Sequence, residues 1–237
     1  MSKTYVVYGV SKGLGRAIIE SVPLPQDIVF GVSRSEPKTL KRKFEWIQAD
    51  LSAPQHAVTV VTQAVAQQPV DYVIYNVGIW EALAFSDEYS FAGSSVTEIT
   101  TLINTNITSC ILQLQALVNN LKLSANAKVI LIGSTWGLDN HKGPEVAFSA
   151  SKHALRGVVH ALRETLRPLN IGISLLNLGY LATEFDLSHS PEDVIEQSQG
   201  QLIPLQDVLL AIRFILATST ASCVKEIDMP AMQDINV

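Results

Sequence analysis

The strongest constraint on the fold of this chain is a regular alternation of short apolar runs with longer amphipathic segments. The apolar runs, rich in Val, Ile and Tyr, are typical of buried strands, and the longer segments have helical spacing. Strands alternating with helices imply βαβ units and a parallel sheet. We therefore expect a Rossmann-like, doubly wound α/β fold with a mainly parallel seven-stranded sheet and helices on both faces. The predicted strands are 5–8, 27–32, 44–48, 71–75, 128–132, 171–177 and 224–228, and the predicted helices are 13–20, 53–68, 94–123 (one helix or two in series), 149–167 and 205–217.

A single domain over residues 1–237 is expected, because no linker, low-complexity tract or internal repeat interrupts this pattern. The apolar fraction of 47% and the charged fraction of 16% exclude a disordered chain. A net charge of −5 argues against a protein that binds nucleic acid by neutralising phosphates. Cys110 and Cys223 are too few for a disulfide framework. With no export segment or spanning stretch in view, we expect a cytoplasmic protein that binds no membrane.

The first chemical motif is a glycine-rich turn with the spacing G-x-x-x-G-x-G, placed between the first strand and the first helix. Glycines there permit a tight turn and let the backbone approach a pyrophosphate, while the helix N-terminus favours the anion. This context predicts dinucleotide binding. The predicted contacts are Gly9, Ser11, Lys12, Gly13, Leu14 and Gly15.

The end of the second strand predicts NADP(H) rather than NAD(H). A carboxylate there would repel a 2′-phosphate, and the sequence Ser33-Arg34-Ser35 has none. Arg34 can hold a phosphate through two bonds, Ser33 offers a hydroxyl, and Lys12 adds a second cation. The basic run Lys38, Lys41, Arg42 and Lys43 is interpreted as a solvated helix face outside this site.

With these motifs the chain resembles the classical branch of the short-chain dehydrogenase/reductase family, over essentially its whole length. Residues 8–15 are similar to the family's T-G-x-x-x-G-x-G, with Tyr8 in place of Thr. Residues 75–78 (Tyr-Asn-Val-Gly) stand where the family has N-N-A-G, and residues 177–183 resemble N-P-G-x-x-x-T, with Leu178 replacing Pro. The resemblance implies adenine contacts from Asp50 and Leu51, further cofactor contacts from Asn76, Gly78, Lys152, Gly179 and Thr183, a proton-relay water held by Asn106, and a substrate-oxygen contact from Ser134.

The main departure from the family is Phe148, four residues before Lys152. The family has Tyr-x-x-x-Lys, in which Tyr protonates the carbonyl oxygen as hydride arrives, while Lys lowers the pKa of that Tyr and bonds the nicotinamide ribose. Without the phenol, general acid catalysis worth about 10²–10⁴-fold is missing. Three interpretations stay open: a natural protein that turns nothing over, a natural protein with other chemistry such as hydride addition to an activated C=C, or an engineered Tyr→Phe change.

Two side chains are candidate replacements for the phenol. Tyr180 follows the nicotinamide-binding glycine, and His141 lies in the loop after the fifth strand. Ser149 is disfavoured, because neighbouring side chains on a helix point about 100° apart. No His, Cys, Asp or Glu spacing suggests a metal site.

The substrate region is less specific in the sequence. Trp80, Phe85 and Trp136 follow sheet ends and either line an apolar pocket or pack as ordinary core. Residues 184–202 predict a short, polar substrate lid over a modest, open pocket.

The expected function is an NADP(H)-dependent short-chain oxidoreductase that transfers hydride to or from a small carbonyl, alcohol or enone. The alternative is a catalytically silent NADP(H)-binding sensor or scaffold protein. A homodimer or homotetramer is also expected, since two predicted helices carry more apolar surface than one sheet face can cover. The residues behind this expectation are Leu112, Leu114, Leu117, Val118, Leu121, Leu155, Val158, Val159 and Leu162.

Overall fold

Seven short apolar strands form one sheet. The computed structural model describes residues 2–38, 40, 42–139 and 141–236. The strand order is β3-β2-β1-β4-β5-β6-β7, and every neighbouring pair is parallel. Strands covered on both faces read as continuous apolar runs, which explains the strand pattern in the sequence. The strands are β1 (Thr4–Tyr8), β2 (Ile28–Ser33), β3 (Glu45–Gln48), β4 (Tyr72–Tyr75), β5 (Lys128–Ile132), β6 (Gly172–Leu178) and β7 (Glu226–Met229).

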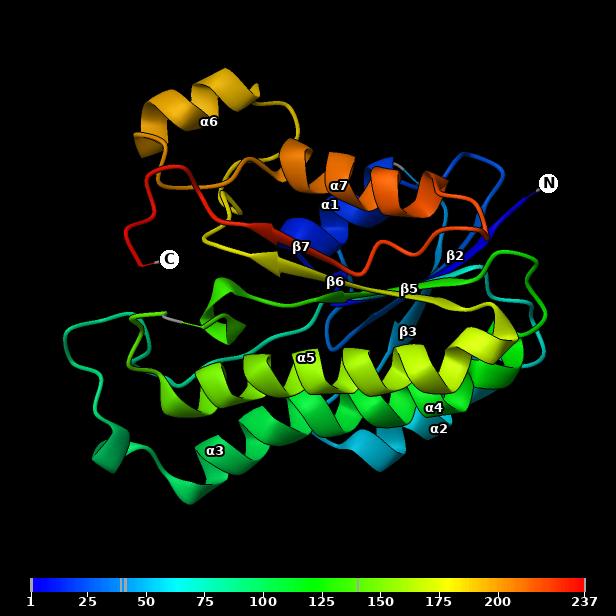
Figure 1. Cartoon of the computed structure of the whole chain (residues 1–237), viewed down its shortest axis with the longest axis horizontal. Helices are drawn as coiled ribbons and strands as arrows, with labels where there is room; N and C mark the ends of the chain where they lie inside the picture. The colour runs from blue at the N-terminus through cyan, green and yellow to red at the C-terminus, as the bar shows by residue number, and fades with distance from the viewer. Residues whose placement is uncertain (1, 39, 41, 140, 237) are drawn as a thin grey trace.

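Helices cover both faces of this sheet, as Figure 1 shows. Helices α2, α4 and α5 pack against one face, and α1 and α7 against the other. The predicted doubly wound α/β fold is therefore confirmed. In the described part of the chain, no helix is long and apolar enough to cross a membrane. The helices are α1 (Gly13–Ser21), α2 (Pro54–Val65), α3 (Val96–Ile103), α4 (Ser109–Leu121), α5 (Val146–Leu166), α6 (Pro191–Ser198) and α7 (Leu205–Ala217).

Two segments have more structure than the sequence indicates. The segment 94–123 is two helices in series, α3 and α4, joined by a single π turn at Asn104–Thr108. The predicted lid, residues 184–202, contains α6, which the sequence analysis missed. Ser190 caps α6 by accepting a hydrogen bond from the backbone N–H of Asp193, and the Asp193 side chain returns the contact. This reciprocal cap stabilises a helix too short and polar to show a clear period.

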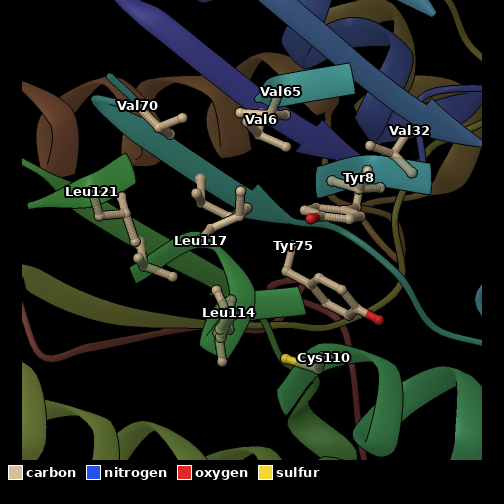
Figure 2. Packing of buried hydrophobic residues seen from close by; sticks show 14 of the residues in the cluster. Val6, Tyr8, Val32, Val65, Val70, Tyr75, Cys110, Leu114, Leu117 and Leu121 are labelled. Carbon is tan, nitrogen blue, oxygen red and sulfur yellow. The ribbon is translucent and has the colours of Figure 1, made fainter. Parts of the chain in front are cut away.

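Most of the apolar residues predicted to drive self-association lie in the core of this chain. Five of these nine residues are buried there, where α4 and α5 meet the sheet. Figure 2 shows Leu114, Leu117 and Leu121 among the side chains of this core. The apolar residues of that set that remain partly exposed are Leu112, Val118, Val158 and Leu162. Association of this chain with itself stays a prediction that depends on these four residues.

The strand order creates a crevice at one end of the sheet. The chain builds outward from β1 to β3 on one side and from β4 to β7 on the other, so β1 and β4 are neighbours with helices on opposite faces. Ligands of doubly wound folds bind outside the carboxyl ends of the strands at such a point. The glycine turn follows β1 and Asn76 follows β4, so the topology brings both to this crevice.

Candidate active site

The glycine turn is shaped by close contacts that only glycine can make. Gly9 has φ +79°, and a Cβ on it would lie 2.0 Å from the backbone oxygen of Asn76. A Cβ on Gly15 would lie 2.1 Å from the backbone oxygen of Gly9. The turn after β1, the first turn of α1 and the end of β4 are thus packed together with no room for a side chain. This is the arrangement a pyrophosphate needs to reach the backbone.

The N-terminus of α1 is free to meet an anion. Within the described residues, Lys12 makes no side-chain cap, and the first turn of α1 holds no acidic residue. Its N–H groups and the helix dipole therefore favour a phosphate. Thr183 lies opposite, since a Cβ on Gly13 would be 3.2 Å from its Cγ2. Leu14 is buried in the core, so only its backbone faces this turn.

The ends of β2 and β3 hold the residues predicted for the adenosine half. Arg34 is exposed. Partial burial raises the pKa of the Asp50 carboxyl, but hydrogen bonds from Ser52 and the charge of Arg34 outweigh this and lower it. The Ser33 hydroxyl is already engaged: it donates to the backbone oxygen of Ser35 at 2.8 Å and accepts from Trp46 Nε1 at 3.1 Å. Of the two side chains predicted at the end of β2, Arg34 is therefore more open to a phosphate than Ser33.

The basic run after β2 does not form the predicted helix face. Residues 42–44 are not helical, and the Arg42 guanidinium donates to the backbone oxygens of Pro23 at 2.7 Å and Asp27 at 3.2 Å. Lys41 lies outside the described residues. Arg42 and Lys43 line a cavity of about 910 Å³ that also includes Lys12, Gly13 and Thr183. A cavity lined by side chains of both charges thus adjoins the glycine turn.

Lys152 is the central charged group at the other end of the crevice. Its side chain is 4% exposed, and Nζ donates to the backbone oxygen of Ile132 at 3.2 Å. A Cβ on Gly78 would lie 3.1 Å from Nζ, so the glycine after β4 makes space for the amine. Burial lowers the pKa of Lys152 to about 8, because a charged amine is poorly solvated there. The Phe148 ring lies beside it, with Nζ 5.6 Å from the ring centroid.

Asn106 ties the crevice to helix α5. It sits in the π turn and is fully buried. Its Oδ1 accepts from the backbone N–H of Ile79 at 2.9 Å, and Nδ2 donates to the Ile79 oxygen at 2.8 Å and to Ser151 Oγ at 3.0 Å. Ser151 in turn donates to the backbone oxygen of Phe148 at 2.7 Å. Asn106 therefore fixes the loop after β4 against the turn of α5 that carries Phe148.

Ser134 and Gly179 stand at the ends of the two following strands. Ser134 is 8% exposed and accepts a hydrogen bond from the backbone N–H of Trp136 at 3.2 Å. Gly179 lies under the C-terminal segment, since a Cβ on it would be 3.2 Å from the backbone nitrogen of Ala231. The carboxyl ends of β5 and β6 therefore border the same crevice as β1 and β4.

Five aromatic side chains gather beside Lys152, and we call them the aromatic box. The ring of Phe85 is their centre, with centroid distances of 5.2 Å to Trp136, 5.6 Å to Trp80 and to Phe148, and 5.9 Å to Tyr180. Phe85 holds this place with φ +64°, which is rare for a bulky residue. From the sequence, Trp80, Phe85 and Trp136 were expected either to line an apolar pocket or to pack as ordinary core. The structure brings them onto Phe148 and Tyr180.

Two glutamates that the sequence analysis missed support this box. Glu145 accepts from Trp136 Nε1 at 2.7 Å and from the backbone N–H of Phe85 at 2.8 Å. Glu81 accepts from the backbone N–H groups of Ala147 at 2.8 Å and Phe148 at 3.3 Å. Each is 2% exposed. The one signal in the sequence was the position of Glu145 directly before α5, where the helix dipole favours an acid.

The remaining candidates have clear surroundings. His141 packs on Trp136 at 3.8 Å, and burial lowers its pKa. Ser149 donates to the backbone oxygen of Trp136 at 3.0 Å and so has a structural partner. Among the described residues, no group of three His, Cys, Asp or Glu side chains could hold a metal ion.

Comparison with known proteins fits this geometry. A family model described as short chain dehydrogenase matches residues 3–193. The farnesol dehydrogenase of Aedes aegypti is 25% identical over 234 residues, covering 91% of this chain and 90% of that enzyme. Two solved structures share the fold: a blue fluorescent protein from a metagenomic library in complex with NADPH (TM-score 0.75, 20% identity, 98% of each chain) and a short chain dehydrogenase from Leptospira borgpetersenii with bound NAD+ (TM-score 0.78, 17% identity, 97% of this chain and 92% of that one).

Proposed function

The chain belongs to the short-chain dehydrogenase family, and from this premise we propose that it is an NADP(H)-dependent oxidoreductase acting on a small carbonyl, alcohol or enone. The observation that carries the proposal is the pairing of two features along one crevice. A glycine turn and an uncapped helix N-terminus lie at one end, and a buried lysine lies at the other. Bound there, the nicotinamide would supply or accept the hydride.

The described residues fit such a cofactor. Gly9, Gly13 and Gly15 leave the space that a pyrophosphate requires, with Ser11, Lys12 and the backbone of Leu14 around it. In this proposal Asn76, Gly78, Lys152, Gly179 and Thr183 hold the nicotinamide half, and Asp50 and Leu51 hold the adenine.

Arg34 is proposed to select NADP(H) over NAD(H). Arg34 is exposed at the end of β2, and its immediate neighbours in the sequence are Ser33 and Ser35, neither of which is a carboxylate. A bidentate bond to a 2′-phosphate is charge-assisted. Since relatives of this fold are found with either NADPH or NAD+, the choice has to rest on this chain's own residues, and Arg34 is the one that favours the phosphate.

For a carbonyl substrate, Ser134 would donate to the substrate oxygen and Lys152 would orient the cofactor and supply positive charge. Asn106 would act by holding Ile79 and Ser151 in place. Phe148 is proposed to stand at the family's proton-donor position, and it supplies no proton. This leaves the carbonyl reaction without its general acid.

A silent NADP(H)-binding protein is the second candidate, and one observation favours it. Phe85 fills the centre of the aromatic box, and Ser134, Phe148 and Lys152 are each less than a tenth exposed. Little of Ser134 is therefore open to a carbonyl in this conformation. The two candidates make opposite predictions for turnover and the same prediction for cofactor binding.

The test is to measure NADPH binding and NADPH oxidation for the chain and for Phe148→Tyr, with ketones and enones. Phe and Tyr differ by one oxygen, so packing should hold and the NADPH dissociation constant should change by less than about threefold. Turnover of a ketone should rise at least about a hundredfold, the lower end for a positioned general acid. If the variant binds NADPH and still turns over no ketone or enone, the silent candidate is favoured.

A further inference from the structure

The aromatic box is surrounded by more negative than positive groups. Glu145 touches both Trp136 and Phe85, and Glu81 touches the backbone N–H of Phe148. Asp234, from the C-terminal segment, adds a third carboxylate: its Oδ2 would lie 3.5 Å from a Cβ on Gly179. Burial and then the charges of Asp234 and Glu145 raise the pKa of Tyr180, so both carboxylates act on the box.

Two of these carboxylates are only partly hydrogen-bonded within the described residues. Among the described residues, Glu81 Oε2 and Asp234 Oδ2 are buried and have no hydrogen-bond partner. A buried carboxylate oxygen without a partner is unfavourable by itself, so each is available to an incoming donor or cation. Two basic side chains of the described residues lie against the box: Lys152, 5.6 Å from the Phe148 ring, and His141, 3.8 Å from the Trp136 ring. Burial lowers the pKa of both, which disfavours their charged forms.

This environment disfavours the charge that carbonyl reduction creates. Hydride addition to C=O leaves a developing oxyanion, which needs positive groups or a proton donor. Beyond Ser134 and Lys152, the one hydroxyl of the described box is that of Tyr180, whose raised pKa makes it a weaker acid; three carboxylates lie nearby, and position 148 is a phenylalanine. Aromatic rings with adjacent carboxylates instead favour a cation, through cation–π attraction and direct charge complementarity.

An iminium group suits both the carboxylates around the box and the absence of a proton donor at position 148. Its carbon accepts hydride, forming a C–H bond, while the π electron pair of C=N⁺ moves onto nitrogen. The products are a neutral amine and oxidised cofactor, and no proton is needed in the step. The positive charge passes from substrate to cofactor, so no oxyanion forms.

We propose that the natural substrate class of this site is a cationic iminium compound, held by the aromatic box with Glu81 and Asp234 as its counter-charges. The inference rests on the proposed hydride transfer from NADPH and makes it specific. Phe85, whose ring is central to the box, is the side chain that such a substrate displaces.

The experiment compares two substrates of similar shape. One is N-methyl-dihydroisoquinolinium, a permanent cation, and the other is tetralone, a neutral ketone. NADPH oxidation is followed for both, with protein-free rates subtracted, and NADPH binding is measured separately. We expect the iminium to turn over at least about a hundredfold faster than the ketone, the lower end of the factor that a missing general acid removes.

Two variants test the counter-charges. Glu81→Gln keeps an oxygen for the N–H groups of Ala147 and Phe148 while it removes the charge, and it should raise the KM for the iminium about tenfold, equivalent to about 1.4 kcal/mol. Asp234→Asn serves the same purpose if the first variant fails to fold. Glu88→Gln, an exposed carboxylate of the same loop, is the matched control and should change nothing. In each variant the NADPH dissociation constant should stay the same.

The outcomes distinguish a failure of the iminium proposal from a failure of the proposed function. If NADPH binds but the iminium is reduced no faster than the ketone, or not at all, the iminium inference is wrong and the cofactor assignment survives. Equal KM values in the parent, both charge-removing variants and the control would also overturn it. If NADPH does not bind, the proposed function itself is wrong.

Discussion

Removing the buried amine of Lys152 should make the cofactor-free protein more stable. Burial lowers the pKa of this lysine from 10.5 to about 8. Each pKa unit corresponds to about 1.36 kcal/mol, so charging Lys152 in the folded protein at neutral pH costs about 3 kcal/mol. Lys152→Met replaces the amine with an apolar side chain of similar reach that adapts to the available space. The lost hydrogen bond to Ile132 offsets about 1 kcal/mol of the gain.

The expected net effect is a stabilisation of about 2 kcal/mol at pH 7, or about 4–8 °C in Tm for a chain of this size. Its pH dependence has a definite sign. Between the folded pKa of about 8 and the usual value of 10.5, the unfolded chain binds one proton that the folded chain does not. The stability of the parent protein therefore rises with pH across this window. The advantage of Lys152→Met is complete below pH 8 and disappears by about pH 10.5.

Urea unfolding of cofactor-free protein at pH 7 and at pH 10 measures this. Lys38→Met, at an exposed lysine, is the control and should show no such pH-dependent difference. A variant that is less stable than the parent at pH 7, or a gain that stays constant with pH, would refute the assignment of Lys152 as a poorly solvated charge. NADPH binding should weaken in the same variant, since Lys152 is proposed to hold the nicotinamide half of the cofactor at a cost to stability.

The remaining predictions concern the cofactor, the π turn and self-association. Arg34→Asp should abolish or reverse a preference of at least tenfold for NADPH over NADH, equivalent to about 1.4 kcal/mol, and equal affinities in the parent would contradict it. Asn106→Leu leaves the buried backbone N–H and C=O of Ile79 without their hydrogen-bond partner, so the free energy of unfolding in urea should fall by about 2–4 kcal/mol. A change within error would show that other contacts hold the loop. Light scattering at micromolar concentration should give a dimer or tetramer, and Val158→Glu should dissociate it; a monomeric parent would end that prediction.

The strands and most helices could be predicted because the pattern of apolar residues in each element reflects which of its positions are buried. Strand β5, Lys-Val-Ile-Leu-Ile, is buried throughout and reads as an apolar run. Helix α6 lacked this signal because it buries only Val194 in the described structure and is held by its Ser190 cap. A short polar helix looks like a loop until its cap is seen.

The shape of the glycine turn was predictable for a similar reason. Gly9, Gly13 and Gly15 lie within one short segment, so their spacing indicates the tight turn directly. For the aromatic box, the sequence indicated Trp80, Phe85 and Trp136 as possible pocket residues but not their contacts with Phe148 and Tyr180, because the box joins distant segments. Glu81 and Ala147 are 66 residues apart in the sequence, and Phe85 takes its place through a left-handed backbone conformation that its residue type does not favour. Local pattern cannot indicate a contact of either kind.

The surroundings of Tyr180 indicate how the aromatic box changes the acidity of a phenol, and this helps to interpret the phenylalanine at position 148. Burial and two nearby carboxylates raise the pKa of Tyr180, which makes it a weaker acid. A tyrosine at position 148 would meet the same influence from Glu81, which contacts the backbone there, against the opposing influence of Lys152. The charges around position 148 are therefore mixed, with a carboxylate at its backbone and an amine beside its ring. A substrate that needs no proton at the step of hydride transfer makes the phenylalanine and the carboxylates consistent with each other.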